Sequence, residues 1–358
     1  MRGIKTLILA TLAFVGVGFV GANASAKTIT EADLVDGTYT LAEDLSETLI
    51  IDGLTMTLNL NGKTLDGSIS AKNGAKVTIT GNGKVGDTKD GKVYAVGEGT
   101  EITIKNGTFK STDTGNVALI HATEKAKITI EDGTFKAAPA VGDEKEGKVI
   151  YAGSNSGKDG YQDKYGYIVI TGGNFAGRLS NSNWGVYTVS GGTFDRNVMA
   201  YYEVPATLTA SWPKTNETTT LAEAGWLVEG YEMVALDGGG YGVKQKELKV
   251  TFDANGHGNG INSTVTYGEK ATKPENPTAE GYTFGGWYTD EECTEEFDFD
   301  TLIKTDVTLY AKWTQAVLAP DTGRVTRSND FMTADMTAAM VVVMTIALAG
   351  VSIKAVKR

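Results

Sequence analysis

Few residues in the sequence combine the types and the spacing that enzyme chemistry or metal binding requires. The 358 residues include one cysteine, Cys293, and two histidines. This excludes a disulfide framework and a cysteine-rich zinc site, and it leaves little room for histidine-based chemistry. Residues 81–86 have the spacing G-x-G-x-x-G, but a turn-like stretch and then a strand follow them. A dinucleotide site needs a helix there, so that its N-terminus meets the phosphates, and we predict no cofactor and no metal.

Cleavage of acidic polysaccharides needs a basic residue close to acidic side chains, and the sequence offers two candidates. Between residues 27 and 314 the arginines are Arg178 and Arg196. They stand at different distances from the preceding phenylalanine, and no pair of aspartates shares a repeat position near them. His121 has no evident partner, and the acidic residues within 290–300 lack the D-x-D-x-D-G spacing of a calcium loop. We therefore predict that the protein is not an enzyme.

A group of aromatic residues with neighbouring amides is the candidate for ligand binding. Aromatic faces stack on sugar rings while amides bond to sugar hydroxyls, so this composition suits a glycan. The alternative is that these side chains cover the side of the fold and hold a long loop in place. The candidate ligand-binding residues are Tyr151, Tyr161, Tyr165, Tyr167, Trp184 and Tyr187.

A repeated element must position these residues, because short alternating segments recur in the first half of the chain. Each segment is a strand of alternating apolar and polar residues that ends in a glycine turn, often followed by a phenylalanine. Further short strands precede several of them, so two or three strands fall within each period of roughly 20–26 residues. The repeated segments are residues 58–62, 77–81, 102–109, 128–135, 168–175 and 187–194.

This rhythm, from residue 49 to residue 194, resembles the right-handed β-helix regions of bacterial surface proteins and pectate-lyase-like proteins. The resemblance implies parallel coils that stack about 4.8 Å apart. It also implies an internal ladder of stacked rings, formed by Phe109, Phe135, Phe175 and Phe194.

The ends of this β-helix domain, residues 27–246, have patterns of their own. Residues 27–48 are predicted to cap the first coil. Residues 140–165 are predicted to leave the stack as a polar excursion, and the sequence leaves open whether one or two coils follow Phe135. Residues 197–246 are predicted to close the stack, with a hairpin formed by residues 230–234 and 240–243.

A second module follows in residues 247–314. Its blocks V-T-F-D-A-N-G, G-Y-T-F-G-G-W-Y and T-L-Y-A-K-W begin at Val250, Gly281 and Thr308. In their order they strongly resemble the Listeria–Bacteroides repeat, the B-repeat type of internalin proteins. The resemblance implies a small, β-grasp-like module of exported proteins that is associated with adhesion or spacing.

The N-terminus has the pattern of an export signal. Arg2 and Lys5 give a positive start, an apolar run follows, and residues 24–26 form an A-x-A cleavage site. We predict that residues 1–26 are a signal peptide, and the alternative is an N-terminal membrane anchor.

The C-terminus has three parts in a fixed order. Residues 315–330 form a linker with a short motif, an apolar stretch long enough to span a membrane begins at residue 331, and a basic tail ends the chain at residue 358. This order resembles the cell-wall sorting signal of Gram-positive surface proteins. The matching pentapeptide is Ala319, Pro320, Asp321, Thr322 and Gly323.

This resemblance implies that a sortase-type transpeptidase cuts between Thr322 and Gly323 and joins the threonine to a peptidoglycan precursor. Ala319 stands where the family has leucine, so the class of sortase is open. The alternative is a plain C-terminal membrane anchor, with residues 331–358 as a permanent transmembrane helix and tail.

The sequence as a whole predicts a mainly β protein. We expect a right-handed parallel β-helix, a β-grasp-like B-repeat module and a C-terminal transmembrane helix. The net charge of −11 argues against a nucleic-acid partner. The expected function is that of a cell-surface protein, covalently attached to the cell wall and adhesin-like, that binds a host protein or a glycan. The alternatives are a polysaccharide lyase or hydrolase on the same β-helix, and a passive surface spacer.

Overall fold

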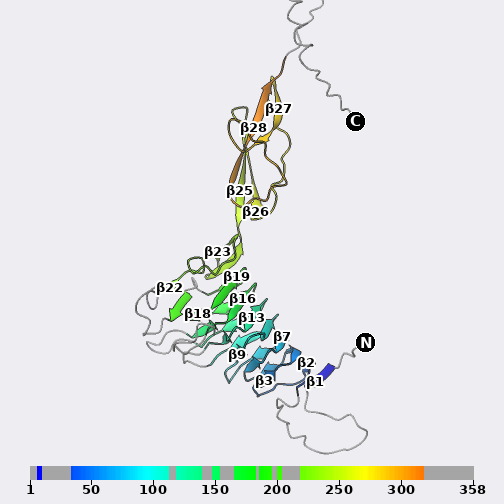
Figure 1. Cartoon of the computed structure of the whole chain (residues 1–358), viewed down its shortest axis with the longest axis vertical. Helices are drawn as coiled ribbons and strands as arrows, with labels where there is room; N and C mark the ends of the chain where they lie inside the picture. The colour runs from blue at the N-terminus through cyan, green and yellow to red at the C-terminus, as the bar shows by residue number, and fades with distance from the viewer. Residues whose placement is uncertain are drawn as a thin grey trace, which may run out of the picture.

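Three sheets of parallel strands form the first half of the described molecule (Figure 1). In this computed structural model, most strands of sheets A, B and C pair in parallel with strands one period away in the sequence. The structure describes residues 6–9, 34–112, 118–138, 147–153, 165–182, 185–195, 200–203 and 218–317.

Sheet A has the strand order β1-β2-β4-β7-β10-β13-β16-β19. Its strands alternate between buried and partly exposed residues, so one side faces the interior and the other faces outward. Its strands are β1 (Thr6–Leu9), β2 (Gly37–Leu41), β4 (Thr55–Asn59), β7 (Lys76–Thr80), β10 (Glu101–Ile104), β13 (Lys127–Ile130), β16 (Tyr167–Ile170) and β19 (Val186–Val189).

Sheets B and C complete each coil. The strands of sheet B are β5 (Thr64–Leu65), β8 (Lys84–Val85), β11 (Thr108–Lys110), β14 (Thr134–Lys136), β17 (Asn174–Ala176) and β20 (Thr193–Phe194), with β23 (Tyr231–Ala235) and β24 (Tyr241–Gln245) at one end. The strands of sheet C are β3 (Leu49–Asp52), β6 (Ile69–Lys72), β9 (Val93–Val96), β12 (Ile120–Thr123), β15 (Lys148–Ala152), β18 (Arg178–Ser182), β21 (Ala200–Glu203) and β22 (Thr218–Thr219).

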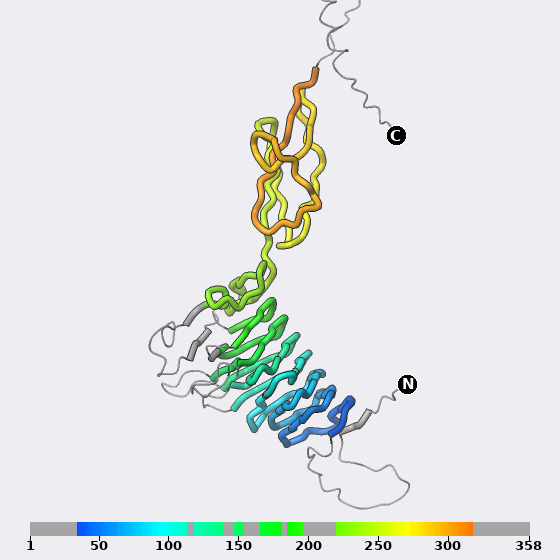
Figure 2. Tube along the Cα trace, viewed as in Figure 1, coloured from blue at the N-terminus to red at the C-terminus, as the bar shows by residue number. Residues whose placement is uncertain are grey.

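From β4 to β21 the chain visits the three sheets in the same rotation, from sheet A to sheet B to sheet C. Figure 2 shows the result as a series of similar rungs that run from the blue to the green part of the chain. This is the arrangement of a parallel β-helix, in which each coil pairs with the coils before and after it. The expectation of a mainly β protein with parallel sheets is confirmed.

A ladder of phenylalanine rings fills the interior next to sheet B, as the sequence predicted. Neighbouring rings lie 4.9, 4.9 and 5.1 Å apart between centroids, with interplanar angles of 10°, 9° and 16°. All four side chains are buried. In-register parallel pairing places the same residue type at the same height in successive coils, so the rings must stack face to face. The members are Phe109, Phe135, Phe175 and Phe194.

One coil, not two, separates Phe135 from Phe175, because the two residues are direct partners in sheet B. The excursion predicted for residues 140–165 is not continuous. In the middle of that range, strand β15 belongs to sheet C and pairs with β12 and β18. Residues 139–146 and 154–164 lie outside the described residues.

Antiparallel strands close the C-terminal end of the stack. Strand β22 pairs with β21, and β24 pairs with β20 and forms a hairpin with β23, as the sequence predicted. The ring centroids of Trp226 and Tyr187 lie 4.0 Å apart in a stacked pair. The main-chain carbonyl of Trp226 accepts a hydrogen bond from the N–H of Val189 at 2.8 Å. At the other end, the predicted cap is in part a rung, because β2 is already a strand of sheet A.

A separate sheet, sheet D, forms the second module beyond the end of the stack (Figure 1). The order is β26-β25-β28-β27, with a parallel central pair and antiparallel outer pairs. One side carries a core of its own that includes Val250, Phe252, Trp287 and Leu309. The strands are β25 (Glu247–Asp253), β26 (Ile261–Thr266), β27 (Tyr282–Tyr288) and β28 (Val307–Gln315).

A short joint connects the two modules, because Lys246 alone separates β24 from β25. The N–H of Lys246 donates to the carbonyl of Gly230 at 2.8 Å. The hydroxyl of Tyr267 donates to the carboxylate of Glu229 at 2.5 Å, and the side-chain amide of Gln245 donates to the carbonyl of Tyr267 at 2.9 Å. The joint is therefore held by both main-chain and side-chain bonds.

The predicted end signals fall mostly outside the described residues. The sorting motif at 319–323 and the apolar segment from 331 to 358 are not described. Of the predicted signal peptide, β1 is described, and it pairs in parallel with β2. Over the described ranges, no helix has the length and apolar character that a membrane crossing needs.

Candidate functional site

The outer face of sheet A carries a row of threonines, which we call the threonine column. Each member pairs in register with the next, so neighbouring side chains stand about 4.8 Å apart along the stack. The alternation of the strands points these side chains away from the core, and all are at least partly exposed. Valine replaces threonine at one position of the column, Val169, and the other members are Thr38, Thr57, Thr78, Thr103, Thr129 and Thr188.

A second row, the mixed column, runs beside it on the same face. Its middle holds Lys76, Glu101 and Lys127, which follow one another in register. The Lys76 ammonium lies 2.6 Å from the Glu101 carboxylate. Beside the row, Lys125 pairs with Glu98 at 3.6 Å. These ion pairs are exposed, so they add little stability, but they leave the charges of the face nearly balanced.

Two adjoining hollows lie along this face. The first, of about 520 Å³, is lined by residues of β2, β4, β7 and β10 that include Thr57 and Thr78. The second, of about 360 Å³, is lined by residues that include Lys127, Tyr167 and Thr188. Glu101 borders both hollows. Together they follow the stack from its first described rungs to its last.

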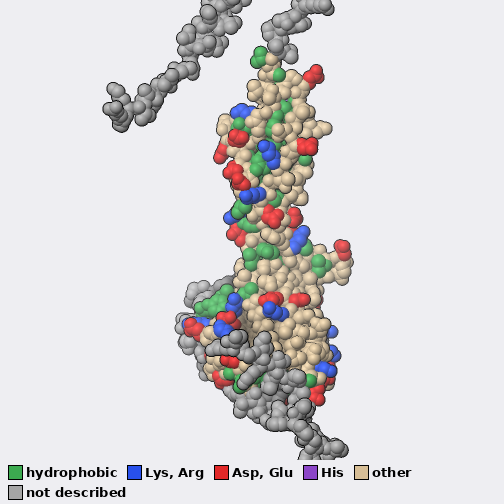
Figure 3. All heavy atoms as spheres, turned by 90° about the vertical axis from the view of Figure 1, so that its right-hand side faces the viewer, with side chains coloured by type: hydrophobic (Ala, Val, Ile, Leu, Met, Phe, Trp, Pro, Cys, Tyr) green, Lys and Arg blue, Asp and Glu red, His purple; other side chains and the backbone are tan. Residues whose placement is uncertain are grey.

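The chemical character of this face is polar but weakly charged. The side on which the strands of sheet A lie in Figure 1 faces the viewer in Figure 3. Much of the described β-helix surface there is tan, the colour of backbone and of side chains that are neither hydrophobic nor charged (Figure 3). This matches the threonines that the strand register places on sheet A.

Tyr167 follows Lys127 in the mixed column, which ends one coil later at the exposed Val186, and Tyr167 forms an aromatic pair with Tyr165. The ring centroids lie 5.2 Å apart at 75°, and the Tyr167 hydroxyl donates to the Tyr165 hydroxyl at 3.1 Å. That hydrogen bond raises the pKa of Tyr167 above its usual value. Tyr167 is therefore uncharged at neutral pH, and its ring lines the second hollow.

The structure separates the aromatic residues that the sequence grouped as a ligand site. Tyr165 and Tyr167 belong to the outer face of sheet A, whereas Tyr161 and Trp184 lie outside the described residues. Tyr187 is a correction, because it points into the core. Its side chain is 4% exposed, and its hydroxyl donates to the carbonyl of Ser180 at 2.5 Å. Burial raises the pKa of Tyr187 well above its usual value.

Tyr151 is the second correction, and it lies on a different sheet. It stands in register with His121 of sheet C and is 2% exposed, so it cannot offer a ring to a ligand in this conformation. The ring of His121 lies 5.7 Å from that of Tyr94 and 5.0 Å from that of Tyr151. Its Nε2 lies 2.9 Å from the carbonyl oxygen of Gly153, and burial lowers its pKa. His121 is therefore a neutral, packed side chain.

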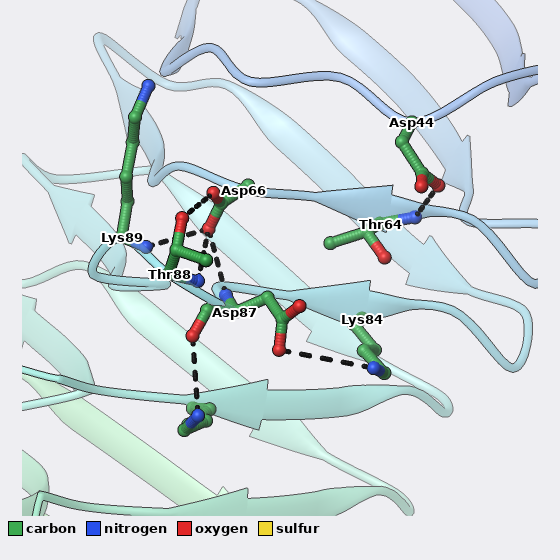
Figure 4. A network of polar contacts seen from close by, with 8 residues as sticks. Asp44, Thr64, Asp66, Lys84, Asp87, Thr88 and Lys89 are labelled. Carbon is green, nitrogen blue, oxygen red and sulfur yellow. Dashed lines mark hydrogen bonds and ion pairs between the residues drawn. The ribbon is translucent and has the colours of Figure 1, made fainter.

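The glycine-rich segment at 81–86 is a corner of the stack. Strand β8 lies within it, and no helix follows in the described chain. Close by, the carboxylate of Asp66 accepts hydrogen bonds from the N–H groups of Asp87, Thr88 and Lys89 and from the Thr88 hydroxyl (Figure 4). The hydroxyl and these N–H groups hold the pKa of Asp66 far below its usual value. Such a carboxylate clamps two coils and is a poor proton donor.

The other candidates for chemistry remain unassembled within the described ranges. No group of three or more histidine, cysteine, aspartate or glutamate side chains there could hold a metal ion. Cys293 is buried, and its thiol lies 3.7 Å from the carbonyl oxygen of Ala311. Arg178 is in sheet C, whereas Arg196 is not described.

Sequence reasoning missed the threonine column, although the signal was present. The aligned segments V-T-I-T, I-T-I-K and I-T-I-E carry threonine at the same outward position. The apolar positions of these segments predicted the core ladder, whereas the threonines between them were not considered as a surface.

Comparisons with known proteins identify the second module. Residues 249–312 match the family model of the Listeria-Bacteroides repeat domain. One similar protein of Evansella cellulosilytica, whose name is that of a Gly-rich membrane protein, is 44% identical over 68 residues, which are 19% of this chain and 8% of that protein. A second, named as a membrane protein of the same organism, is 36% identical over 107 residues, 30% of this chain and 14% of that protein.

The chain spans only 8% and 14% of the lengths of these two proteins, so it shares a segment with each of them. From the family model, the chain contains a Listeria-Bacteroides repeat domain at residues 249–312.

Proposed function

We propose that the protein is a bacterial surface protein, adhesin-like and without enzymatic activity, that binds its ligand with the outer face of sheet A. The observation that carries this proposal is the repeated array of threonines along two adjoining hollows. A surface built from repeats offers an extended, regular face for a large ligand. The repeat module and the membrane-protein names of the two relatives support a place in the cell envelope.

Covalent attachment to the cell wall is the second part of the proposal. In this scheme the signal peptide at 1–26 directs export, and the apolar segment from 331 halts it. A sortase-type transpeptidase then cuts after Thr322 and transfers the chain to a peptidoglycan precursor. The Listeria-Bacteroides repeat acts as a spacer between the wall and the β-helix. The right-handed winding, the β-grasp relationship and the membrane helix stay predictions.

The attachment is tested by fractionating cells that express the full chain. We expect the protein to resist hot detergent and to be released by digestion of peptidoglycan. The double variant Pro320→Ala, Thr322→Ala should move to the membrane or the medium, whereas Thr326→Ala, outside the motif, should stay in the wall. Extraction of the unaltered protein by detergent alone would contradict wall attachment and favour the plain membrane anchor.

The binding function is tested with the same cells on arrays of glycans and matrix proteins. We expect saturable binding that Thr103→Arg on sheet A weakens and Thr134→Arg on the outer side of sheet B does not. Release of new reducing ends from polysaccharides would favour the lyase or hydrolase. Wall attachment without binding to any array would favour the passive spacer.

A further inference from the structure

The outer face of sheet A differs in charge from the molecule as a whole. The chain carries a net charge of −11. On this face, however, Lys76, Lys125 and Lys127 stand beside Glu98 and Glu101, and two ion pairs join them. Three lysines against two glutamates leave a surplus of only one positive charge, so an acidic polymer would gain little attraction here and would be repelled by the remainder of the protein. The face therefore favours an uncharged ligand.

The threonine column also has the geometry of a repeated contact. Each threonine hydroxyl can donate one hydrogen bond and accept others, and its methyl group adds an apolar contact. Sugars present this mixture of hydroxyls and C–H groups. Because the side chains recur about every 4.8 Å along the stack, a ligand that is itself a repeat can make the same contact many times. A small molecule would use only one or two of these positions.

The aromatic pair makes the two hollows of the face different from each other. Tyr167 lines the second hollow at β16, and Tyr165 packs against its ring, whereas the lining of the first hollow includes threonines and no aromatic residue. An aromatic ring stacks well on the apolar face of a sugar. A bound chain would therefore have its strongest single contact at the second hollow.

We infer that the outer face of sheet A binds a neutral, unbranched polysaccharide in an extended conformation, which runs along the stack from Thr38 to Thr188 and packs a sugar ring on Tyr167. This inference rests on the proposed binding function of the same face and adds the class of ligand. It requires no bond to be made or broken.

The test uses cells that display the full chain, with the amount at the surface matched by antibody. The probes are fluorescent β-1,4-glucan, β-1,4-mannan and β-1,4-xylan oligosaccharides of graded length, with polygalacturonate as the anionic comparison. We expect saturable binding of at least one neutral series, with an affinity that rises with length because each added sugar meets a further threonine. The affinity should change less than twofold between about 0.05 and 0.5 M salt, since screening affects only charged ligands.

Variants then locate the ligand on the face. Thr103→Val and Thr129→Val keep the branched shape and remove one hydroxyl each, and together they should weaken binding about three- to tenfold. Tyr167→Ala should weaken it about tenfold or more. The matched control is Thr134→Val on sheet B, which should leave the affinity unchanged.

The outcomes separate the inference from the function on which it rests. Salt-sensitive binding of polygalacturonate alone, or binding independent of length, would overturn the neutral-polymer inference. The same holds if no polysaccharide binds while Thr103→Arg still abolishes adhesion to a matrix protein, and in that case the adhesin function survives. If cells bind nothing and the variants have no effect, both fail.

Discussion

Two aromatic pairs, one in the stack and one in the second module, have nearly the same distance between ring centroids and very different interplanar angles. Phe109 and Phe135 lie 4.9 Å apart with their planes 10° from parallel. Phe252 and Trp287 lie 5.0 Å apart at 65°. In the stack the register forces identical residues into parallel layers, whereas Phe252 of β25 meets Trp287 of β27 edge to face. The first core extends along many coils, each of which packs on the coils before and after it, whereas the second core gathers around one sheet.

This difference predicts two ways to lose stability. A stack whose coils contact only their neighbours should fail locally, because its stability is a sum over coils and interfaces. A single cluster should fail as a unit. The four predictions below use this contrast and run from the largest expected effect to the smallest.

The largest effect is expected from removing one ring of each core. Phe135→Ala and Trp287→Ala should each cost about 3–5 kcal/mol, since both side chains are buried and leave cavities. In Phe135→Ala, hydrogen exchange in the full chain should accelerate mainly in β11, β14 and β17. In Trp287→Ala, it should accelerate through the whole of sheet D and leave the stack unchanged.

Phe135→Leu is the control, because leucine keeps much of the apolar volume. It should reduce the free energy of unfolding less than Phe135→Ala does. A uniform loss of protection from β2 to β19 in Phe135→Ala would show that the stack unfolds as one unit. The contrast between the two cores would then be wrong.

A smaller loss is expected at the glycine corner before the ladder. Gly133 has a φ of +128°, and an added Cβ would lie 3.0 Å from the carbonyl oxygen of Gly107 and 3.1 Å from the Phe135 ring. Gly133→Ala should therefore cost about 2–3 kcal/mol, measured by urea unfolding. Gly62 has a φ of +74° and open space around it, so Gly62→Ala isolates the backbone cost at about 1 kcal/mol. Equal losses would show that crowding against the ladder does not matter.

The interior of the stack could be predicted from sequence because it repeats. Phenylalanine at one position in successive segments, each after a glycine, predicts a ladder without knowledge of the coil count. The same alignment places Tyr187 at the inward position of Ile168, so its burial was also predictable. The prediction of a ligand-binding role for Tyr187 followed its aromatic side chain and not its inward position in the strand register.

Other features could not be predicted from the repeat. Tyr151 is at an outward position of sheet C, and alternation of residues does not encode what covers a sheet from outside. The number of coils after Phe135 was open because long insertions between strands cost little extra entropy, so spacing does not fix the coil count. The charge balance of the outer face depends on which strands become neighbours, since Lys76 and Glu101 meet only across the stack.

The third prediction concerns the carboxylate clamp between two coils. Asp66 accepts its hydrogen bonds most strongly when ionised, so its pKa in the folded protein is lower than the usual 3.8. Its stabilisation is therefore fully present above about pH 4 and is lost as the pH falls below that value. Asp66→Asn should cost about 1 kcal/mol at pH 7, a figure reduced for the exposed setting, and the difference from the parent should shrink toward pH 2.

Urea unfolding at pH 7, 4 and 2 measures this loss. The control is Asp87→Asn, because the Asp87 carboxylate makes a 4.0 Å contact with Lys84 and should contribute less than about 0.5 kcal/mol. A difference between Asp66→Asn and the parent that stays constant down to pH 2 would contradict a charge-dependent clamp.

The smallest effect is expected at the joint, where the two kinds of core meet. The ring of Tyr267 crosses Gly230 so closely that an added Cβ there would lie 2.3 Å from it, and the hydroxyl bonds to Glu229. Tyr267→Phe keeps the ring and removes an exposed hydrogen bond, so it should lower the free energy of unfolding less than any of the changes above. Hydrogen exchange of β23 and β26 should rise together, since the bond ties one module to the other.

Tyr310→Phe is the matched control, because Tyr310 lies in the same sheet D and away from the joint. It should leave β23 unchanged. If Tyr267→Phe raises hydrogen exchange in β26 and not in β23, the modules are joined only through the main chain at Lys246. The β-helix would then pivot on its spacer. If both strands respond, the joint transmits order from the module to the stack and holds the outer face of sheet A in a fixed direction relative to the module.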